Sequence, residues 1–256
     1  MTDKPNAPPA PPPCRLDGPH GPLAFLRQDG AGPCVVWLGG YASDMRGTKA
    51  EAIARWAETR GQAYLRFDYA GHGESGGDFE DGTIGRWTAD ARAVIEAETS
   101  GPLVLVGSSM GAWIAGLLAR DAGLDLAGLL LLAPAPDFTE DLTRADWSED
   151  DHARLARDGR IAFPSAYDDS EMIYTKALFE DGAQNLLLRA PLPIPCPVRI
   201  LQGTSDDAVP WAHAVRYAEH IEAEDLTVTL IKDADHRLST PREVRRLLAT
   251  LEELCG

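Results

Sequence analysis

Basic residues are scarce in this sequence. Its 256 residues include 24 Lys and Arg against 40 Asp and Glu, which gives a formal net charge of −16. Proteins that bind nucleic acids neutralise phosphates with clustered Lys and Arg, and the sequence has no such cluster. Its composition therefore argues against nucleic acid as a partner and indicates a well-solvated acidic surface.

Cysteines are also few, and long apolar runs are absent. Cys14, Cys34, Cys196 and Cys255 lack C-x-x-C spacing, so neither a zinc site nor a disulfide framework is predicted, as in a reducing compartment. No apolar run approaches the roughly 20 residues that cross a bilayer. The start, MTDKPNAPPAPPPC, has neither the features of a secretory signal nor the Arg and Ser of a transit peptide. We therefore expect a cytoplasmic protein without a membrane span.

The rest of the chain alternates between apolar runs and helical patterns. Helices are expected at 47–60, 83–99 and 110–123, and strands are predicted at residues 22–28, 34–40, 62–68, 102–107, 126–134, 197–203 and 226–232. This alternation predicts an α/β fold with a mostly parallel central sheet and helices on both faces. A disordered Pro-rich tail over residues 1–20 is expected to precede a single domain over residues 21–256.

One long segment, about 137–192, interrupts the alternation. It contains no clear strand, and helical patterns occur within it at 141–159 and 170–188. A structureless loop of this length would be unusual in a compact domain. We therefore predict a small helical cap that covers one end of the sheet.

A candidate nucleophile lies where an apolar strand meets an apolar helix. The stretch Gly107-Ser108-Ser109-Met110-Gly111 matches G-x-S-x-G with Ser109 at its centre. In this pattern a sharp turn from strand to helix exposes the serine hydroxyl beside the positive end of the helix. Ser109 is therefore the candidate nucleophile. Ser108 lacks flanking glycines and is interpreted as a packed turn residue.

A serine nucleophile needs an oriented base, and two of the six histidines follow predicted strands. His72 comes after the strand at 62–68, and His236 comes after the strand at 226–232. Functional loops of an open parallel sheet lie beyond the carboxyl ends of its strands, so both positions qualify. Folds with this serine turn supply Ser, then Asp or Glu, then His along the chain. This order favours His236 as the base and leaves His72 a structural role in its loop.

Two aspartates, Asp206 and Asp207, follow the predicted strand at 197–203 and could orient His236. One could instead cap the next helix. The transition state of acyl transfer also needs N–H donors for its oxyanion. Met110, which follows the nucleophile, offers one backbone N–H. The second is expected from Gly40 or Tyr41, after the strand at 34–40, and Tyr41 is preferred. Its ring is expected to line the pocket.

Several motifs together resemble the α/β-hydrolases, and in particular the branch of mitochondrial palmitoyl-protein thioesterases that also hydrolyse acyl glucuronides. They are WLGGYASDMRGTKA, RFDYAGHGESGG, VGSSMGAW, CPVRILQGTSDDAVPW and DADHR. The wider pattern G-x-x-D-x-x-V-P falls on Gly203, Asp206, Val209 and Pro210. The resemblance thus selects Asp206 over Asp207 and implies a triad of Ser109, Asp206 and His236.

We therefore expect a serine-dependent carboxylesterase or thioesterase, of the EC 3.1 class, that forms an acyl-enzyme. Its partner is a small-molecule or acylated substrate, and no metal or organic cofactor is implied. The acidic DADH cluster at 233–236 is interpreted as a solvated turn. A serine peptidase, a C–C hydrolase or a non-catalytic ligand-binding protein are the alternatives on this fold. The sequence specifies neither the acyl group, nor the substrate-binding residues, nor the oligomeric state.

Overall fold

The computed structural model describes residues 11–121, 123–145, 147–165 and 171–256. Its centre is an eight-stranded sheet in the order β1-β2-β4-β3-β5-β6-β10-β12. The strands are β1 (Cys14–Gly18), β2 (Gly21–Gln28), β3 (Ala31–Leu38), β4 (Gln62–Phe67), β5 (Leu103–Ser108), β6 (Leu126–Leu132), β10 (Val198–Gly203) and β12 (Leu226–Ile231). The pairs β1–β2 and β2–β4 are antiparallel, and all others in this sheet are parallel. The predicted mostly parallel sheet is confirmed.

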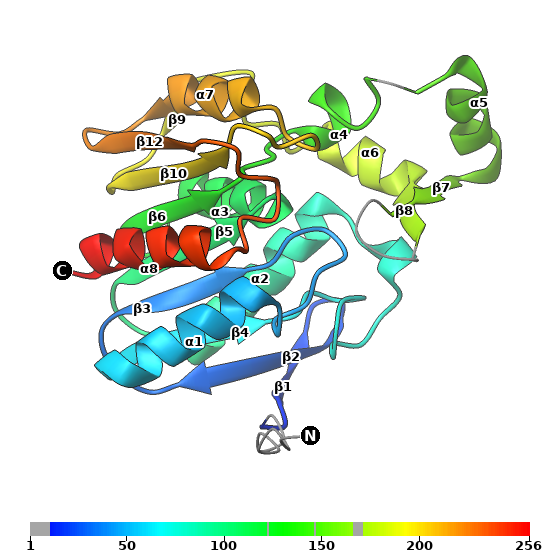
Figure 1. Cartoon of the computed structure of the whole chain (residues 1–256). Coiled ribbons are helices and arrows are strands. Elements are labelled where there is room, and N and C mark those ends of the chain that lie inside the picture. The colour runs from blue at the N-terminus through cyan, green and yellow to red at the C-terminus, as the bar shows by residue number, and fades with distance from the viewer. Residues whose placement is uncertain (1–10, 122, 146, 166–170) are drawn as a thin grey trace, which may run out of the picture.

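Helices cover both faces of this sheet (Figure 1). On one face α1 (Thr48–Arg60) and α8 (Pro241–Cys255) pack on side chains of β3, β5 and β6. On the other, α2 (Ile84–Glu98), α3 (Met110–Arg120) and α7 (Trp211–His220) enclose the larger apolar core. Every residue of β5 is buried, as a strand covered on both faces requires. Three short elements lie outside the central sheet: the 3₁₀ turn η1 (Phe79–Asp81), and the two-residue strands β9 (Leu192–Pro193) and β11 (Ile221–Glu222), which pair with each other.

Local sequence explains where the helices begin and end. Pro241 occupies the first turn of α8, and Thr240, the residue before the helix, forms a capping box with Glu243 of that turn, so the last helix starts sharply. Gly61 ends α1 with φ 63°, a left-handed conformation that glycine adopts without strain. No helix among the described residues is both long and apolar enough to cross a membrane.

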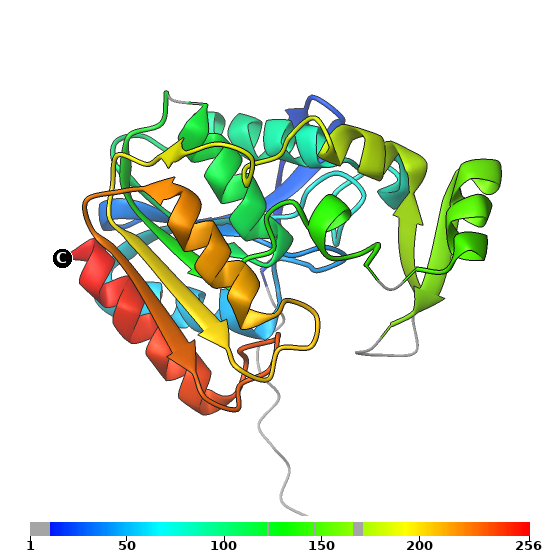
Figure 2. The same ribbon diagram turned by 90° about the horizontal axis from the view of Figure 1, so that it is seen from above.

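The segment between β6 and β10 forms a cap that projects beyond the sheet (Figures 1 and 2). It contains α4 (Phe138–Asp141), α5 (Glu149–Asp158) and α6 (Lys176–Gly182), and also an antiparallel pair, β7 (Arg160–Pro164) and β8 (Glu171–Thr175). The two strands were not predicted. Each has only five residues, β7 ends in a proline, and β8 runs directly into α6, so neither shows a readable alternation.

Two buried groups hold the ends of the cap against the domain. Asp137, which follows β6, is fully buried, and its two carboxylate oxygens accept the N–H groups of Leu187 and Leu188 at 2.7 and 2.8 Å. His213 of α7 donates from Nε2 to the carbonyl of Pro136 at 2.8 Å. A single carboxylate therefore joins the chain entering the cap to the chain leaving it.

The N-terminal boundary needs a correction. The sequence assigned residues 1–20 to a disordered tail, whereas Cys14–Gly18 form β1 and pair antiparallel with β2. The turn Asp17-Gly18-Pro19-His20-Gly21 reverses the chain, and pairing with β2 satisfies the backbone of a strand too short to be recognised by its pattern. Residues 1–10 of the predicted tail lie outside the described residues.

Candidate active site

Ser109 occupies the tight turn between β5 and α3. Its φ and ψ are 54° and −116°, a strained conformation for a residue with a Cβ atom. A Cβ on Gly111 would lie 2.1 Å from the carbonyl oxygen of Leu38, and one on Gly107 would lie 2.4 Å from that of Gly111. Both glycines are therefore required by close backbone approach, which fixes the serine at the carboxyl end of the sheet.

Three predicted side chains meet there although they are far apart in the sequence. Nε2 of His236 lies 3.1 Å from Oγ of Ser109, and Nδ1 of His236 lies 2.9 Å from Oδ2 of Asp206. Ser109 follows β5, Asp206 follows β10 and His236 follows β12, so the parallel sheet itself brings their loops to one edge. Both distances suit a relay in which a serine hydroxyl donates to an imidazole that a carboxylate orients.

Neither aspartate caps the next helix, because the N-cap residue of α7 is Pro210 and no side-chain hydrogen bond caps it. Asp206 instead lies against His236. Besides facing His236, its buried carboxylate accepts the backbone N–H groups of Ala208 and Val209 at 3.0 and 2.7 Å. The amide of Gln202 donates to Asp206 Oδ2 at 2.9 Å, while Asp207 is exposed. Gln202 was not identified from the sequence. The one sequence feature that could have indicated a role for Gln202 is its position as a polar residue near the end of an otherwise apolar predicted strand.

The two predicted oxyanion donors flank the serine. Met110 is the first residue of α3, so its N–H has no acceptor within the helix. Tyr41 follows Gly40, and a Cβ on Gly40 would lie 3.5 Å from the Cβ of Ser109. The backbone of the loop after β3 therefore runs beside the nucleophile.

The side chain of Tyr41 connects this loop to the cap. Its hydroxyl donates to the carbonyl of Ile173, and its ring stacks on that of Tyr174 with a centroid separation of 5.5 Å. Burial raises the pKa of the Tyr41 hydroxyl above its ordinary value, which keeps the group protonated and able to donate. One residue thus joins the reaction centre to strand β8.

His72, the rival base, is buried in an aromatic cluster. Its ring packs against those of Tyr69, Phe79 and Trp87, and its Nδ1 lies 3.4 Å from the carbonyl of Ala70. Burial lowers the pKa of His72 from 6.5 to about 4. The imidazole is therefore neutral at pH 7 and packs within its loop.

Because the pKa of His72 differs between the folded and the unfolded chain, the free energy of unfolding depends on pH. The unfolded chain binds a proton at His72 near pH 6.5, but the folded chain binds it only near pH 4. The free energy of unfolding should therefore fall as the pH drops from 6.5 to 4, with His72 contributing about 3 kcal/mol of the loss. Urea unfolding of the wild type and of His72→Phe across this range measures the contribution. Equal slopes in the two proteins would contradict it.

A cavity of about 720 Å³ contains Ser109 and His236 and extends under the cap. Six aromatic or aliphatic side chains of the cap line it, together with Thr143, Pro164 and Ser165; the six are Phe138, Leu142, Trp147, Phe163, Met172 and Tyr174. Such a volume is in the range of pockets for small organic ligands. These residues were not identified as substrate-binding from the sequence, because they lie in the segment with the least regular pattern.

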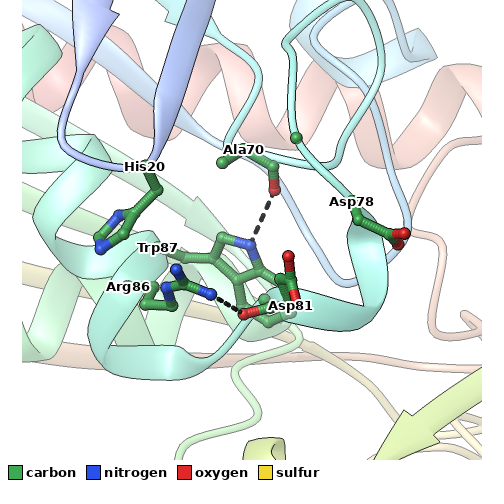
Figure 3. A pocket seen from close by; sticks show the side chains of 8 residues that line it. His20, Ala70, Asp78, Asp81, Arg86 and Trp87 are labelled. Carbon is green, nitrogen blue, oxygen red and sulfur yellow. Dashed lines mark hydrogen bonds between the residues drawn. The ribbon is translucent and has the colours of Figure 1, made fainter.

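A second, much smaller cavity lies beside α2, between His20 and Trp87 (Figure 3). Its volume is about 30 Å³, room for about one or two water molecules. The indole of Trp87 donates to the carbonyl of Ala70 at 3.1 Å, and the guanidinium of Arg86 donates to that of Asp81 at 2.6 Å (Figure 3). This cavity is too small for a substrate.

No group of three or more His, Cys, Asp or Glu side chains is arranged to hold a metal ion in the described part of the chain. In the DADH turn, Asp235 accepts the N–H of Arg237 at 3.0 Å and His236 faces Asp206, so these side chains are engaged within the protein.

Residues 20–247 match the alpha/beta hydrolase family, and the chain belongs to that family. Its α/β-hydrolase fold is thereby confirmed, as expected from the sequence.

The chain is also similar to individual proteins. The bovine "Palmitoyl-protein thioesterase ABHD10, mitochondrial" is 33% identical over 234 residues, which are 91% of this chain and 76% of the relative, and the human protein of that name is 32% identical over the same shares. The structure of mouse alpha/beta hydrolase domain-containing protein 10 has 29% identity and a TM-score of 0.87, over 94% of this chain and 97% of that one. A protein from Agrobacterium vitis S4, assigned as a hydrolase, has 39% identity and a TM-score of 0.92, over 95% and 98%.

The expectation of a cytoplasmic location was wrong. The curated relatives that cover 91% of this chain are named as mitochondrial proteins. Four scattered cysteines and the composition of the first residues had indicated the cytoplasm. Cysteines without disulfide spacing distinguish a protein of a reducing compartment from one of an oxidising compartment, but they do not show which reducing compartment it occupies.

Proposed function

We propose that the protein is a serine hydrolase that cleaves carboxylic esters or acyl thioesters through an acyl-enzyme. The observation that carries this proposal is the hydrogen-bonded series Ser109–His236–Asp206 at the edge of the sheet. The names of the ABHD10 relatives, palmitoyl-protein thioesterases, support acyl thioesters among the substrates.

In the first half-reaction Nε2 of His236 accepts the proton of the Ser109 hydroxyl as Oγ attacks the acyl carbonyl carbon. Asp206 keeps Nδ1 protonated and stabilises the imidazolium that forms. The carbonyl oxygen becomes an oxyanion, which accepts the N–H groups of Met110 and Tyr41. When the tetrahedral intermediate collapses, the bond to the leaving oxygen or sulfur breaks. His236 gives its proton to that atom, which departs as an alcohol or a thiol.

Water completes the cycle. Nε2 of His236 accepts one proton of a water molecule, whose oxygen attacks the acyl carbon of the Ser109 ester. The second tetrahedral intermediate uses the same two N–H donors. As it collapses, the bond from the acyl carbon to Oγ breaks, His236 returns the proton to Ser109, and the carboxylic acid leaves.

The cavity supports an apolar acyl group. Six of the cap residues that line it provide aromatic and aliphatic surface, on which an acyl chain is removed from water at roughly 0.8 kcal/mol per buried CH₂ group. The cap is therefore the part of the chain expected to set the preferred acyl length.

Labelling tests the nucleophile directly. A fluorophosphonate probe is expected to label the wild type at Ser109 and to leave Ser109→Ala unlabelled. Ser108→Ala is the matched control, because it removes the hydroxyl of the adjacent buried residue and should keep the labelling of Ser109. Hydrolysis of a panel of esters, thioesters and peptides by the same proteins defines the reaction. Unchanged ester and thioester hydrolysis by Ser109→Ala would overturn the proposal.

A further inference from the structure

The loop after β3 forms a tight turn over Gly40, Tyr41, Ala42 and Ser43. The N–H of Ser43 donates to the carbonyl of Gly40 at 3.2 Å, and Ala42 has φ 53°. A positive φ at the third residue of such a turn is usual for glycine, and a residue with a Cβ atom keeps it only where surrounding contacts hold the backbone. The N–H of Tyr41, the second proposed oxyanion donor, therefore depends on contacts that fix this turn.

The side chain of Tyr41 makes such contacts with the main domain. Ala42 and Ser43, which follow it, are exposed. The Tyr41 ring packs edge to face against those of Phe79 and Trp87, with centroid separations of 5.0 and 5.7 Å. Its packing therefore anchors the turn.

The same ring also contacts the cap. It stacks on the ring of Tyr174 with an interplanar angle of 8°, and its hydroxyl donates to the carbonyl of Ile173. Both residues belong to β8, which pairs with β7 in a separate two-stranded sheet. A two-stranded sheet is marginally stable by itself. The position of Tyr41 therefore depends on how firmly this strand is held.

Strand β8 is also part of the substrate cavity. Met172 and Tyr174 alternate with Ile173, so they share one face of the strand, and both line the cavity. Phe163, the partner of Met172 on β7, lines it as well. An acyl chain in the cavity would pack on this face and hold the strand in place. The carbonyl of Ile173 would then hold the Tyr41 hydroxyl more firmly.

We propose that the side chain of Tyr41 is a positioning residue that couples the cap to the oxyanion donors. An acyl chain bound under the cap holds β8, and β8 holds the N–H of Tyr41 where the oxyanion forms. The inference rests on the proposed function, because it assumes an oxyanion at the carbon that Ser109 attacks. Contacts of the acyl chain with the cap therefore increase kcat as well as affinity, because they act on the transition state.

Tyr41→Phe tests the positioning role, because it removes the hydroxyl and keeps both the ring and the backbone N–H. With 4-nitrophenyl octanoate, kcat is expected to fall about ten- to a hundredfold, while KM changes by less than about threefold. The loss is smaller than the roughly 10²- to 10³-fold loss of a whole oxyanion donor, because the donor is displaced and not removed.

Tyr64→Phe is the matched control. The hydroxyl of Tyr64 is also buried and also donates to a backbone carbonyl, that of Ala50 at 3.1 Å, but Tyr64 does not line the cavity. This variant should keep the wild-type kcat. Circular dichroism shows whether both variants are folded.

The coupling is tested with 4-nitrophenyl acetate, butanoate and octanoate, which share a leaving group. In the wild type kcat is expected to rise about tenfold from acetate to octanoate, because only a longer chain reaches β8. In Tyr41→Phe this rise should shrink to about twofold or less. KM should fall with chain length in both proteins, since the apolar cap surface is unchanged. A purely structural role of Tyr41 would instead lower kcat by the same factor for all three esters.

A transition-state analogue gives a readout besides turnover. In 1,1,1-trifluorononan-2-one the carbonyl carbon is expected to form a bond to Oγ of Ser109. Its carbonyl oxygen then becomes an oxyanion, and the hydroxyl proton of Ser109 passes to Nε2 of His236. The inhibition constant should rise in Tyr41→Phe by about the factor by which kcat for the octanoate falls. It should stay unchanged in Tyr64→Phe.

The outcomes distinguish the two proposals. Three results would each overturn the positioning role and leave the proposed function intact: a kcat in Tyr41→Phe no lower than in Tyr64→Phe, an unchanged inhibition constant in Tyr41→Phe, or a rise of kcat with chain length that survives in it. Failure of the wild type to hydrolyse any of the three esters, or an octanoyl thioester, would overturn both.

Discussion

His236→Ala is expected to lower kcat for acyl ester or thioester hydrolysis by about 10⁴- to 10⁶-fold, because the loss of one member of such a relay removes nearly all of its contribution. Nε2 of His236 lies 3.1 Å from the Ser109 hydroxyl, and no other histidine is hydrogen-bonded to it among the described residues. His72→Ala should retain far more activity, since the His72 ring packs against Tyr69, Phe79 and Trp87.

Single-turnover and steady-state kinetics of both variants, with circular dichroism to show that each is folded, make the comparison. Asp206→Asn adds a second readout. It keeps the shape of the side chain but favours the wrong tautomer of His236, and a loss of about 10⁴-fold in kcat is expected. Equal losses in His236→Ala and His72→Ala would refute the assignment of the base.

Asp137→Asn is expected to destabilise the fold by about 2–4 kcal/mol, because a buried carboxylate that accepts two backbone N–H groups is replaced by an amide with one acceptor. Asparagine tolerates the left-handed conformation of residue 137, φ 55°, so the change isolates the hydrogen bonds from backbone strain. The lost bonds join the two ends of the cap. Limited proteolysis should therefore cut the cap of this variant sooner than that of the wild type.

Asp141→Asn is the matched control for this prediction. Asp141 lies in the same segment and pairs with Arg189 and Arg216, but these ion pairs are partly exposed and are worth roughly 0–1 kcal/mol each. Urea unfolding measures both variants. A loss in Asp137→Asn no larger than in Asp141→Asn would show that Asp137 does not hold the cap.

The sheet could be predicted from the sequence because its central strands are buried on both faces. Continuous apolar runs such as LVLVGS in β5 and LAGLLLL in β6 are unambiguous when helical patterns separate them. The strands that were missed are short and depend on a partner: β1 needs β2, and β7 needs β8. Their formation depends on tertiary pairing, which local patterns do not encode.

The candidate triad could be located for the same reason. Ser109, Asp206 and His236 each lie in the loop that follows a predicted strand, and parallel strands bring their carboxyl ends to one edge. The contact of Tyr41 with Ile173, 132 residues away, could not be predicted in this way, nor could the support of Asp206 by Gln202. Neither contact follows from residue spacing, because both depend on how side chains pack.

The cap leaves the sheet after β6, the strand that lies between β5 and β10 and carries no member of the proposed triad. The two ends of the cap are joined by the hydrogen bonds of Asp137 to Leu187 and Leu188. The cap is therefore a closed loop that is attached to the sheet at one place. The cap can therefore lengthen, shorten or exchange its side chains without altering the register that aligns Ser109, Asp206 and His236. Under the proposed function, a change in acyl preference therefore requires changes in the cap and none in the strands that carry the triad.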